Sequence, residues 1–161
     1  MRCRKDFLTV GSANQPQPGN ELNSWRLVRT PNPAGGPAAV AAMRTAESAR
    51  SDLEFAGLML RCGEVAPDVL VVLVRPLPIH SHPNVAIDAD GSSVNLIATV
   101  VPPGVLVLLP PEAAALARGS WRRTAEVKIT VAEKGISISG VVSLAGLDAT
   151  IPQLEASCLA K

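Results

Sequence analysis

The segment from Thr124 to Val142, TAEVKITVAEKGISISGVV, constrains the fold of this chain most strongly. Apolar and polar side chains alternate along its first half with a period of two, which is typical of a strand with one buried and one exposed face. The four residues 132–135 then form a turn, because Gly135 can adopt the left-handed conformation that a hairpin requires. The apolar face resumes at Ile136 and Ile138. The sequence therefore predicts an antiparallel hairpin.

Short apolar runs also fill most of the chain after residue 24, and turn signals separate them at intervals of about ten residues. This spacing is typical of an all-β sandwich or barrel. The run 68–74, DVLVVLV, has no polar alternation and is typical of a strand covered on both faces. We expect it to pair with 55–62, and the Asp-Gly at 90–91 predicts a second hairpin turn. Further strands are predicted at 25–30, 84–88, 94–100 and 105–109.

Residues 38–49, AAVAAMRTAESA, are ambiguous between helix and strand. Their alanine content favours a helix, whereas Ala39, Ala41, Met43 and Thr45 also fit one face of a strand. We predict a strand, because a sandwich needs another strand beside residues 24–30.

Two helices are predicted. The first lies in PPEAAALARG, where prolines suit the first turn and Gly119 follows the last. The second lies within 144–158, where Leu144, Leu147, Ile151, Leu154 and Cys158 form one apolar stripe. Since Pro152 suits a first turn, we expect this helix to begin near Thr150 and to be preceded by one loose turn.

The predicted fold is all-β: an antiparallel β-sandwich with a short inserted helix and a C-terminal helix. The sandwich domain should span residues 24–161. Residues 1–23 include GSANQPQPGNELN, which is polar, aperiodic and rich in proline and glycine, so we expect a flexible N-terminal leader.

Composition excludes several classes of partner. The chain carries 15 basic and 14 acidic side chains, so no global positive field exists to hold nucleic acid. Its four aromatic side chains are too few for a series of base-stacking platforms. The uncharged stretch 91–111 is long enough to cross a bilayer, but the pairs Pro102-Pro103 and Pro110-Pro111 would break its backbone hydrogen bonds. We expect no nucleic-acid partner and no membrane span.

The residues alone do not decide the cellular compartment of the protein. MRCRKDFLTV contains no apolar core of a secretory signal, so we expect a cytoplasmic protein unless the true N-terminus lies upstream. Cys62 ends an apolar run and Cys158 lies near the C-terminus, which suits a disulfide that closes a long loop. Two unrelated buried thiols explain the same positions equally well.

One stretch, PIHSHPNVAIDADGSS, offers candidate metal ligands. If residues 79–82 are extended, His80 and His82 project from one face, and two imidazoles on one strand can share a metal. Asp88 or Asp90 could supply a third ligand if the chain folds back toward the two histidines. The alternative is an exposed loop, which the prolines on either side of the histidines favour. A metal site would indicate a small metal-binding protein or a hydrolase that uses His80, His82 and Asp88.

Other catalytic patterns are absent from the sequence. There is no G-x-S-x-G elbow, no C-x-x-C pair and no phosphate-binding loop. DADGSS resembles the opening of a calcium loop, but Thr99 stands at the twelfth position, where a glutamate is required. We expect no catalytic residue and no cofactor.

The order of motifs from Trp25 onward carries a family resemblance. The matching stretches are SWRLVRT, LMLRC, DADG, PPEAAALARGS, AEVKITV and SLAGLDATIPQLEASC. In this order they resemble small exported bacterial proteins of the invasion-associated locus B type and the related accessory lipoproteins of type VI secretion, over residues 24–158.

The resemblance implies a β-sandwich in the periplasm or cell envelope, no catalytic residues, and a role in stress tolerance, host interaction or secretion assembly through protein contacts. It makes Cys62 and Cys158 the natural disulfide pair, and it supports a strand at 38–49. We therefore expect a non-enzymatic accessory protein that binds another protein through an exposed sheet surface. An open edge strand would also permit homo-oligomers by sheet extension.

Overall fold

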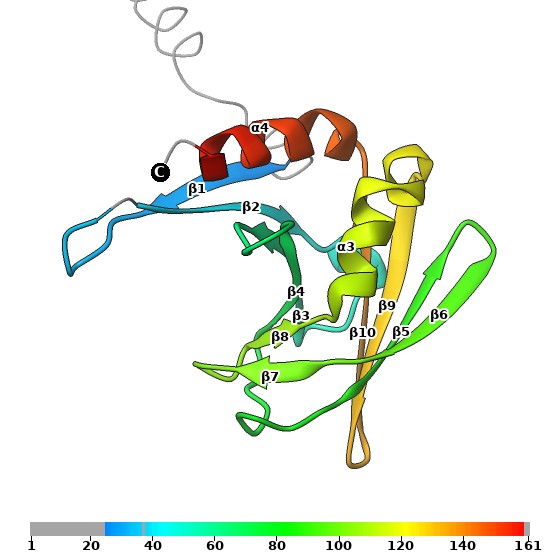
Figure 1. Cartoon of the computed structure of the whole chain (residues 1–161). Coiled ribbons are helices and arrows are strands. Elements are labelled where there is room, and N and C mark those ends of the chain that lie inside the picture. The colour runs from blue at the N-terminus through cyan, green and yellow to red at the C-terminus, as the bar shows by residue number, and fades with distance from the viewer. Residues whose placement is uncertain (1–24, 37, 160–161) are drawn as a thin grey trace, which may run out of the picture.

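The computed structural model describes residues 25–36 and 38–159, and the predicted leader 1–23 lies outside them. Two antiparallel sheets form a β-sandwich, which confirms the predicted fold class (Figure 1). The six-stranded sheet contains, in spatial order, β1 (Arg26–Thr30), β2 (Ala39–Thr45), β3 (Phe55–Arg61), β4 (Asp68–Leu73), β8 (Leu106–Leu108) and β7 (Thr99–Val101). The four-stranded sheet contains β10 (Ile136–Ser143), β9 (Glu126–Glu133), β5 (Asn84–Ala89) and β6 (Ser92–Ile97).

Both predicted hairpins are present in the four-stranded sheet. In the β9–β10 hairpin, Val127, Ile129 and Val131 are buried as their alternation indicates. Its turn is shorter than the four residues expected, because pairing extends to the last residue of β9 and leaves only Lys134 and Gly135 to connect the strands. Both have positive φ, 43° and 82°, as in the two-residue turns that suit the twist of a hairpin.

β2 is a strand, as predicted, but the face chosen from the sequence is the wrong one. Ala39 and Thr45 are exposed, and the buried residues are Val40, Ala42 and Arg44. Pairing with β3 sets Ala42 opposite Leu60 and Arg44 opposite Leu58, and that register directs the even-numbered side chains to the core. Because alanines lie on both faces of the strand, the sequence did not indicate which face is buried.

Arg44 is a charged side chain in this core, with 6% of its surface exposed. Its Nη1 donates a hydrogen bond of 3.4 Å to the carbonyl of Ala145. Burial lowers the pKa of the Arg44 guanidinium, and the nearby Glu47 carboxylate opposes that shift.

The single strand predicted at 94–100 is two strands, β6 and β7, with a break at Ala98. At this residue the chain leaves the four-stranded sheet and enters the six-stranded one. The Ala98 N–H still donates to the Pro83 carbonyl at 3.0 Å, so the chain crosses between sheets without losing that backbone bond. An apolar run cannot reveal such a change of sheet.

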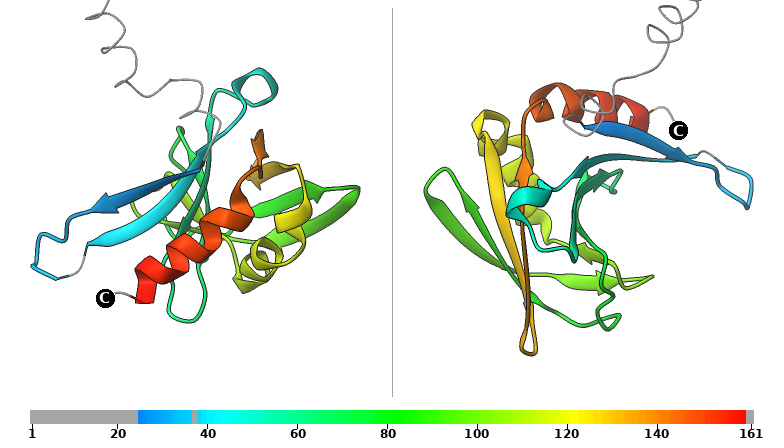
Figure 2. Two further views of the ribbon diagram at one scale, coloured as in Figure 1. Left: turned by 90° about the horizontal axis from the view of Figure 1, so that it is seen from above. Right: turned by 180° about the vertical axis from the view of Figure 1, so that it is seen from behind.

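The helices confirm the two predicted positions. α3 (Pro111–Arg118) is preceded by Pro110, and the short η1 (Ser48–Arg50) and η2 (Ser120–Arg123) add single turns. α4 (Leu147–Leu159) lies across β1 and β2, as the three views agree (Figures 1 and 2). Of the helices that the structure describes, none has both the length and the apolar character needed to cross a bilayer.

α4 begins three residues before the expected start at Thr150. The Gly146 carbonyl accepts hydrogen bonds from the Thr150 N–H at 3.0 Å and the Thr150 hydroxyl at 2.8 Å, which stabilise an additional first turn. Pro152 therefore lies inside the helix, where it lacks the N–H that would bond to the Asp148 carbonyl. The predicted apolar stripe is correct, since Leu147, Ile151 and Leu154 are buried.

Candidate functional site

The structure joins Cys62 and Cys158 in a disulfide, with an S–S distance of 2.04 Å and a Cα–Cα distance of 5.5 Å. Cys62 follows β3 directly, and Cys158 belongs to the last turn of α4. The bond therefore attaches the C-terminal helix to the start of the β3–β4 loop (residues 62–67). The residues alone left the pairing open, whereas the family resemblance implied it.

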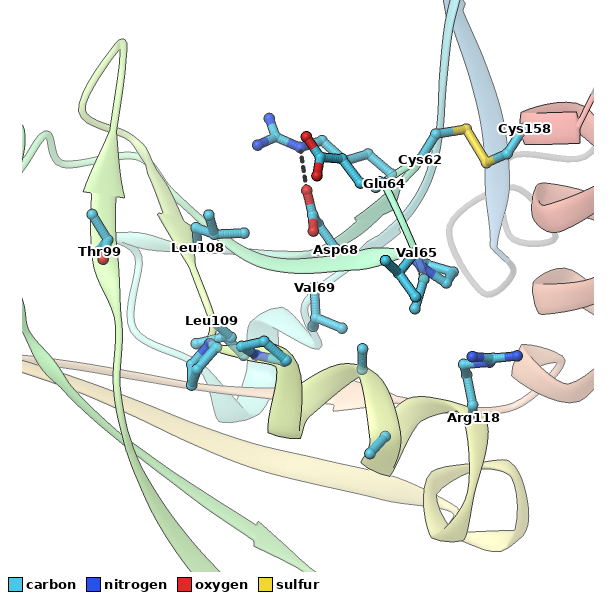
Figure 3. A pocket seen from close by; sticks show the side chains of 18 of the residues that line it. Cys62, Glu64, Val65, Asp68, Val69, Thr99, Leu108, Leu109, Arg118 and Cys158 are labelled. Carbon is cyan, nitrogen blue, oxygen red and sulfur yellow. Dashed lines mark hydrogen bonds and ion pairs between the residues drawn. A yellow bond between two sulfur atoms is a disulfide. The ribbon is translucent and has the colours of Figure 1, made fainter. Parts of the chain in front are cut away.

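This disulfide forms one end of an open groove with a volume of about 1130 Å³ (Figure 3). The β3–β4 loop forms one wall, and the first turns of α3 form the opposite wall. Residues from β6, β7 and β8 complete the groove, which we call the disulfide groove. Four segments distant in sequence contribute to it: 61–69, 97–99, 108–118 and Cys158.

The disulfide groove has a buried apolar floor and two exposed apolar side chains at its margins. Val69 and Leu109 are 1% and 4% exposed and belong to the core. Val65 in the β3–β4 loop is 96% exposed, and Ile97 at the end of β6 is 64% exposed. Water therefore contacts two large apolar side chains beside a preformed depression.

Three charged side chains of the groove form ion pairs, one of them with a residue outside the groove. Arg61 and Asp68 are register partners in the β3–β4 hairpin, and their side chains form an ion pair with an N–O distance of 3.4 Å. Arg118 of α3 pairs with Glu155 of α4 at 3.3 Å. Because these side chains are partly exposed, each pair contributes little to stability. A bound molecule can therefore replace one partner at small cost.

The histidine stretch does not adopt the extended conformation that a shared metal site requires. His80 lies in a turn with φ of 72°. The N–H and the hydroxyl of Ser81 both donate to the Pro78 carbonyl, at 3.2 Å and 2.7 Å. His82 Nδ1 lies 3.2 Å from the Ala98 carbonyl oxygen. The two imidazoles therefore occupy different local environments.

Asp88 lies farther along the same segment, on β5 opposite Lys128 of β9. Asn84, the first residue of β5, is four positions earlier, which corresponds to about 13 Å along a strand. The structure therefore does not bring Asp88 to His80 and His82. Within residues 25–36 and 38–159, no three histidine, cysteine, aspartate or glutamate side chains are grouped so as to hold a metal ion.

Sequence reasoning missed the disulfide groove. Val65 gives no signal because it is a single apolar residue in a loop, and Ile97 belongs to the apolar run 94–100, which predicts a strand but not which of its residues is exposed. The Arg61–Asp68 pair follows from the register of β3 with β4, which the predicted pairing of 55–62 with 68–74 did not specify. Comparison with known proteins returned no match: no family model, no curated protein and no solved structure is significantly similar to this chain.

Proposed function

We propose that this protein is a non-enzymatic accessory protein of the cell envelope, which binds a segment of another protein in the disulfide groove. The observation that carries the proposal is the pair of exposed apolar side chains, Val65 and Ile97, at the margins of this groove. Apolar surface that borders a depression is typical of binding sites, and these two side chains lie on the margins of one depression.

The dimensions of the groove favour a polypeptide over a small ligand. Small-molecule sites usually measure about 300–1,000 Å³ and enclose most of the ligand. The disulfide groove, at about 1130 Å³, lies at the upper end of this scale, and it is open to solvent, so it would not enclose a small ligand. An extended segment can fill such a space, place apolar side chains against Val65 and Ile97, and exchange charges with the Arg61–Asp68 pair.

The disulfide supports an envelope location. Such bonds persist in the periplasm and outside the cell and are rare in the reducing cytosol. Here the bond fixes one wall of the groove to the last turn of α4, so an oxidising compartment would also favour the binding-competent shape. The resemblance to exported proteins of the invasion-associated locus B type, which remains a prediction, implies the same compartment.

A photo-crosslinking amino acid at position 65, in the cells that produce the protein, tests the proposal. We expect a discrete crosslinked protein in the envelope fraction, and we expect competition by unlabelled wild-type protein but not by Val65→Asp. Leu53 provides the matched control, since it is 92% exposed and lies in the loop at the other end of β3. Crosslinker at position 53 should give no such product.

Three results would contradict the proposal. The same products at positions 53 and 65 would indicate non-specific proximity. A Val65→Asp protein that competes as well as the wild type would show that the margin of the groove does not contact the partner. Fractionation to the cytoplasm with both thiols free, measured by alkylation and intact mass, would refute the envelope location.

A further inference from the structure

The edges of the two sheets differ in whether they can accept another strand. An edge strand presents unpaired backbone groups, which proteins usually cover or protect. β10 is covered by the segment between β2 and β3. The Ser139 N–H donates to Asp52 Oδ2 at 2.7 Å, and the Val141 N–H donates to Ser51 Oγ at 2.9 Å. The Val141 carbonyl accepts from the Glu47 N–H at 2.8 Å, so no strand can pair there.

The two edges of the six-stranded sheet are also protected. The outer side of β7 is occupied, because the His80 N–H donates to the Val100 carbonyl at 2.8 Å and the Val100 N–H donates to the Ser81 carbonyl at 3.0 Å. β1 has five residues, and two of them are the exposed Arg26 and Arg29. Charged side chains on a short edge strand oppose the addition of another strand.

In the described part of the chain, β6 is the edge strand that is neither covered nor charged. The residues of β6 that bond to β5 can be assigned from the geometry of the hairpin. Its hairpin with β5 has a two-residue turn at 90–91, so Ala89 and Ser92 form a hydrogen-bonded pair. Such pairs alternate along an antiparallel ladder. The bond from the Ala98 N–H to the Pro83 carbonyl continues the same phase. The even-numbered residues of β6 therefore bond to β5.

The odd-numbered residues Ser93, Asn95 and Ile97 consequently direct their N–H and C=O groups away from β5. In the part of the chain that the structure describes, β6 pairs with β5 alone, so these six groups have no strand partner. The strand contains no charged residue and no proline. Its position at the open edge of the four-stranded sheet is visible in Figure 1.

We propose that β6 binds β6 of a second copy of this chain, antiparallel, with the two-fold axis at Asn95. This register sets Asn95 opposite Asn95 of the second copy and Ser93 opposite Ile97 of the second copy. The outward backbone groups of both chains then meet in hydrogen-bonded pairs. The two four-stranded sheets become one continuous sheet of eight strands.

The apolar pattern of β6 and the number of backbone pairs together favour this partner and this register. On the inner face, Val94 meets Leu96 of the second copy, while in their own sheets these residues already face Ile87 and Val85. The buried apolar row therefore continues across the two chains, and the half-buried Val94 loses its contact with water. A shift of one residue would move the apolar side chains to the solvent face. A shift of two in either direction would leave two outward backbone pairs in place of three, and one of these shifts would also set Leu96 opposite Ser92.

The charges on the outer face are compatible with self-association. Asp88 of β5 faces Lys128 of β9 on one side and Ser93 of β6 on the other. These side chains form a row across the outer face of the sheet, and in the proposed pair the row continues from Ser93 to Ile97 of the second copy. No like charges lie opposite each other at the new contact, so a second copy of the neutral strand fits without repulsion.

Sedimentation of the full, oxidised chain from about 1 μM to about 1 mM tests the proposal. We expect the mass to rise from that of the 16.7 kDa monomer to twice that value with concentration. Asn95→Lys and Asn95→Asp should each weaken association by at least about tenfold, because like charges meet at the two-fold axis. A mixture of the two variants should recover the dimer, since opposite charges then meet.

Two control variants separate this contact from other causes. Ser137→Lys adds the same charge to the exposed face of β10, at the other edge of the same sheet, and should associate like the wild type. Val65→Asp, which perturbs the disulfide groove, should also leave the dimer unchanged. A wild type that remains monomeric throughout would overturn the proposal. Undiminished association of both Asn95 variants, or failure of their mixture to associate, would overturn the register.

Discussion

Removal of the Cys62–Cys158 disulfide should lower stability by an amount that follows from the loop it closes. The two cysteines are 96 residues apart in sequence. In the chain-entropy description, cross-linking a loop of this length removes about 16 cal/mol/K of entropy from the unfolded chain, or about 4.7 kcal/mol at 25 °C. The double variant Cys62→Ser/Cys158→Ser should therefore lose up to about this amount of unfolding free energy.

The same loss can be expressed as a shift in melting temperature. For a domain of this size, 1 kcal/mol corresponds to about 2–4 °C, so the full loss would lower the melting temperature of the double variant by about 9–19 °C relative to the oxidised protein. The native fold should persist below that temperature, because Leu147, Ile151 and Leu154 keep α4 packed on the core without the bond. The expected change is a lower midpoint without a loss of secondary structure at 20 °C.

Urea and thermal unfolding, followed by far-UV circular dichroism, measure both quantities. A Cys3→Ser background for both proteins prevents disulfide exchange with the third cysteine. Reductant should lower the stability of the disulfide-containing protein to that of the double variant and leave the variant itself unchanged. A loss below about 1 kcal/mol would refute the argument that the bond stabilises chiefly by restricting the unfolded chain.

Two further predictions concern the core and the histidines. Gly140→Ala should destabilise the protein by about 1–3 kcal/mol, because its Cβ would lie 2.1 Å from Phe55 Cδ1. Adding Phe55→Leu should relieve part of that cost in a double-mutant cycle, and strictly additive losses would contradict the contact. Calorimetric titration of the tag-free protein with Zn²⁺ should show no stoichiometric binding. One equivalent of metal that is lost in His82→Ala would instead support the alternative function.

Much of the fold could be predicted because its signals are local. The alternation that ends at Val131 reports the two faces of β9 directly, since successive side chains of a strand point to opposite sides. Asp90-Gly91 predicts its hairpin through the backbone conformation that these residues tolerate. The apolar stripe of α4 likewise follows from helical spacing. None of these features depends on residues far away in the chain.

Where local signals were weak, pairing between strands decided the outcome. The alanines of β2 fit either face, and only the register with β3 buried Val40 and Arg44. The apolar run around Ala98 is continuous in sequence, but the chain changes sheets there. The expected start of α4 at Thr150 was wrong because the Gly146 carbonyl finds partners that extend the helix.

The sequence by itself determined that this chain forms paired strands around one core with a C-terminal helix, because strand and helix periodicity are properties of neighbouring residues. Only the tertiary structure decided which side chains meet across long separations. It assembled the disulfide groove from four distant segments, and it left Asp88 apart from His80 and His82. Sequence spacing fixes the direction of a side chain along its own element, whereas the packing of one element against another fixes which functional groups come together.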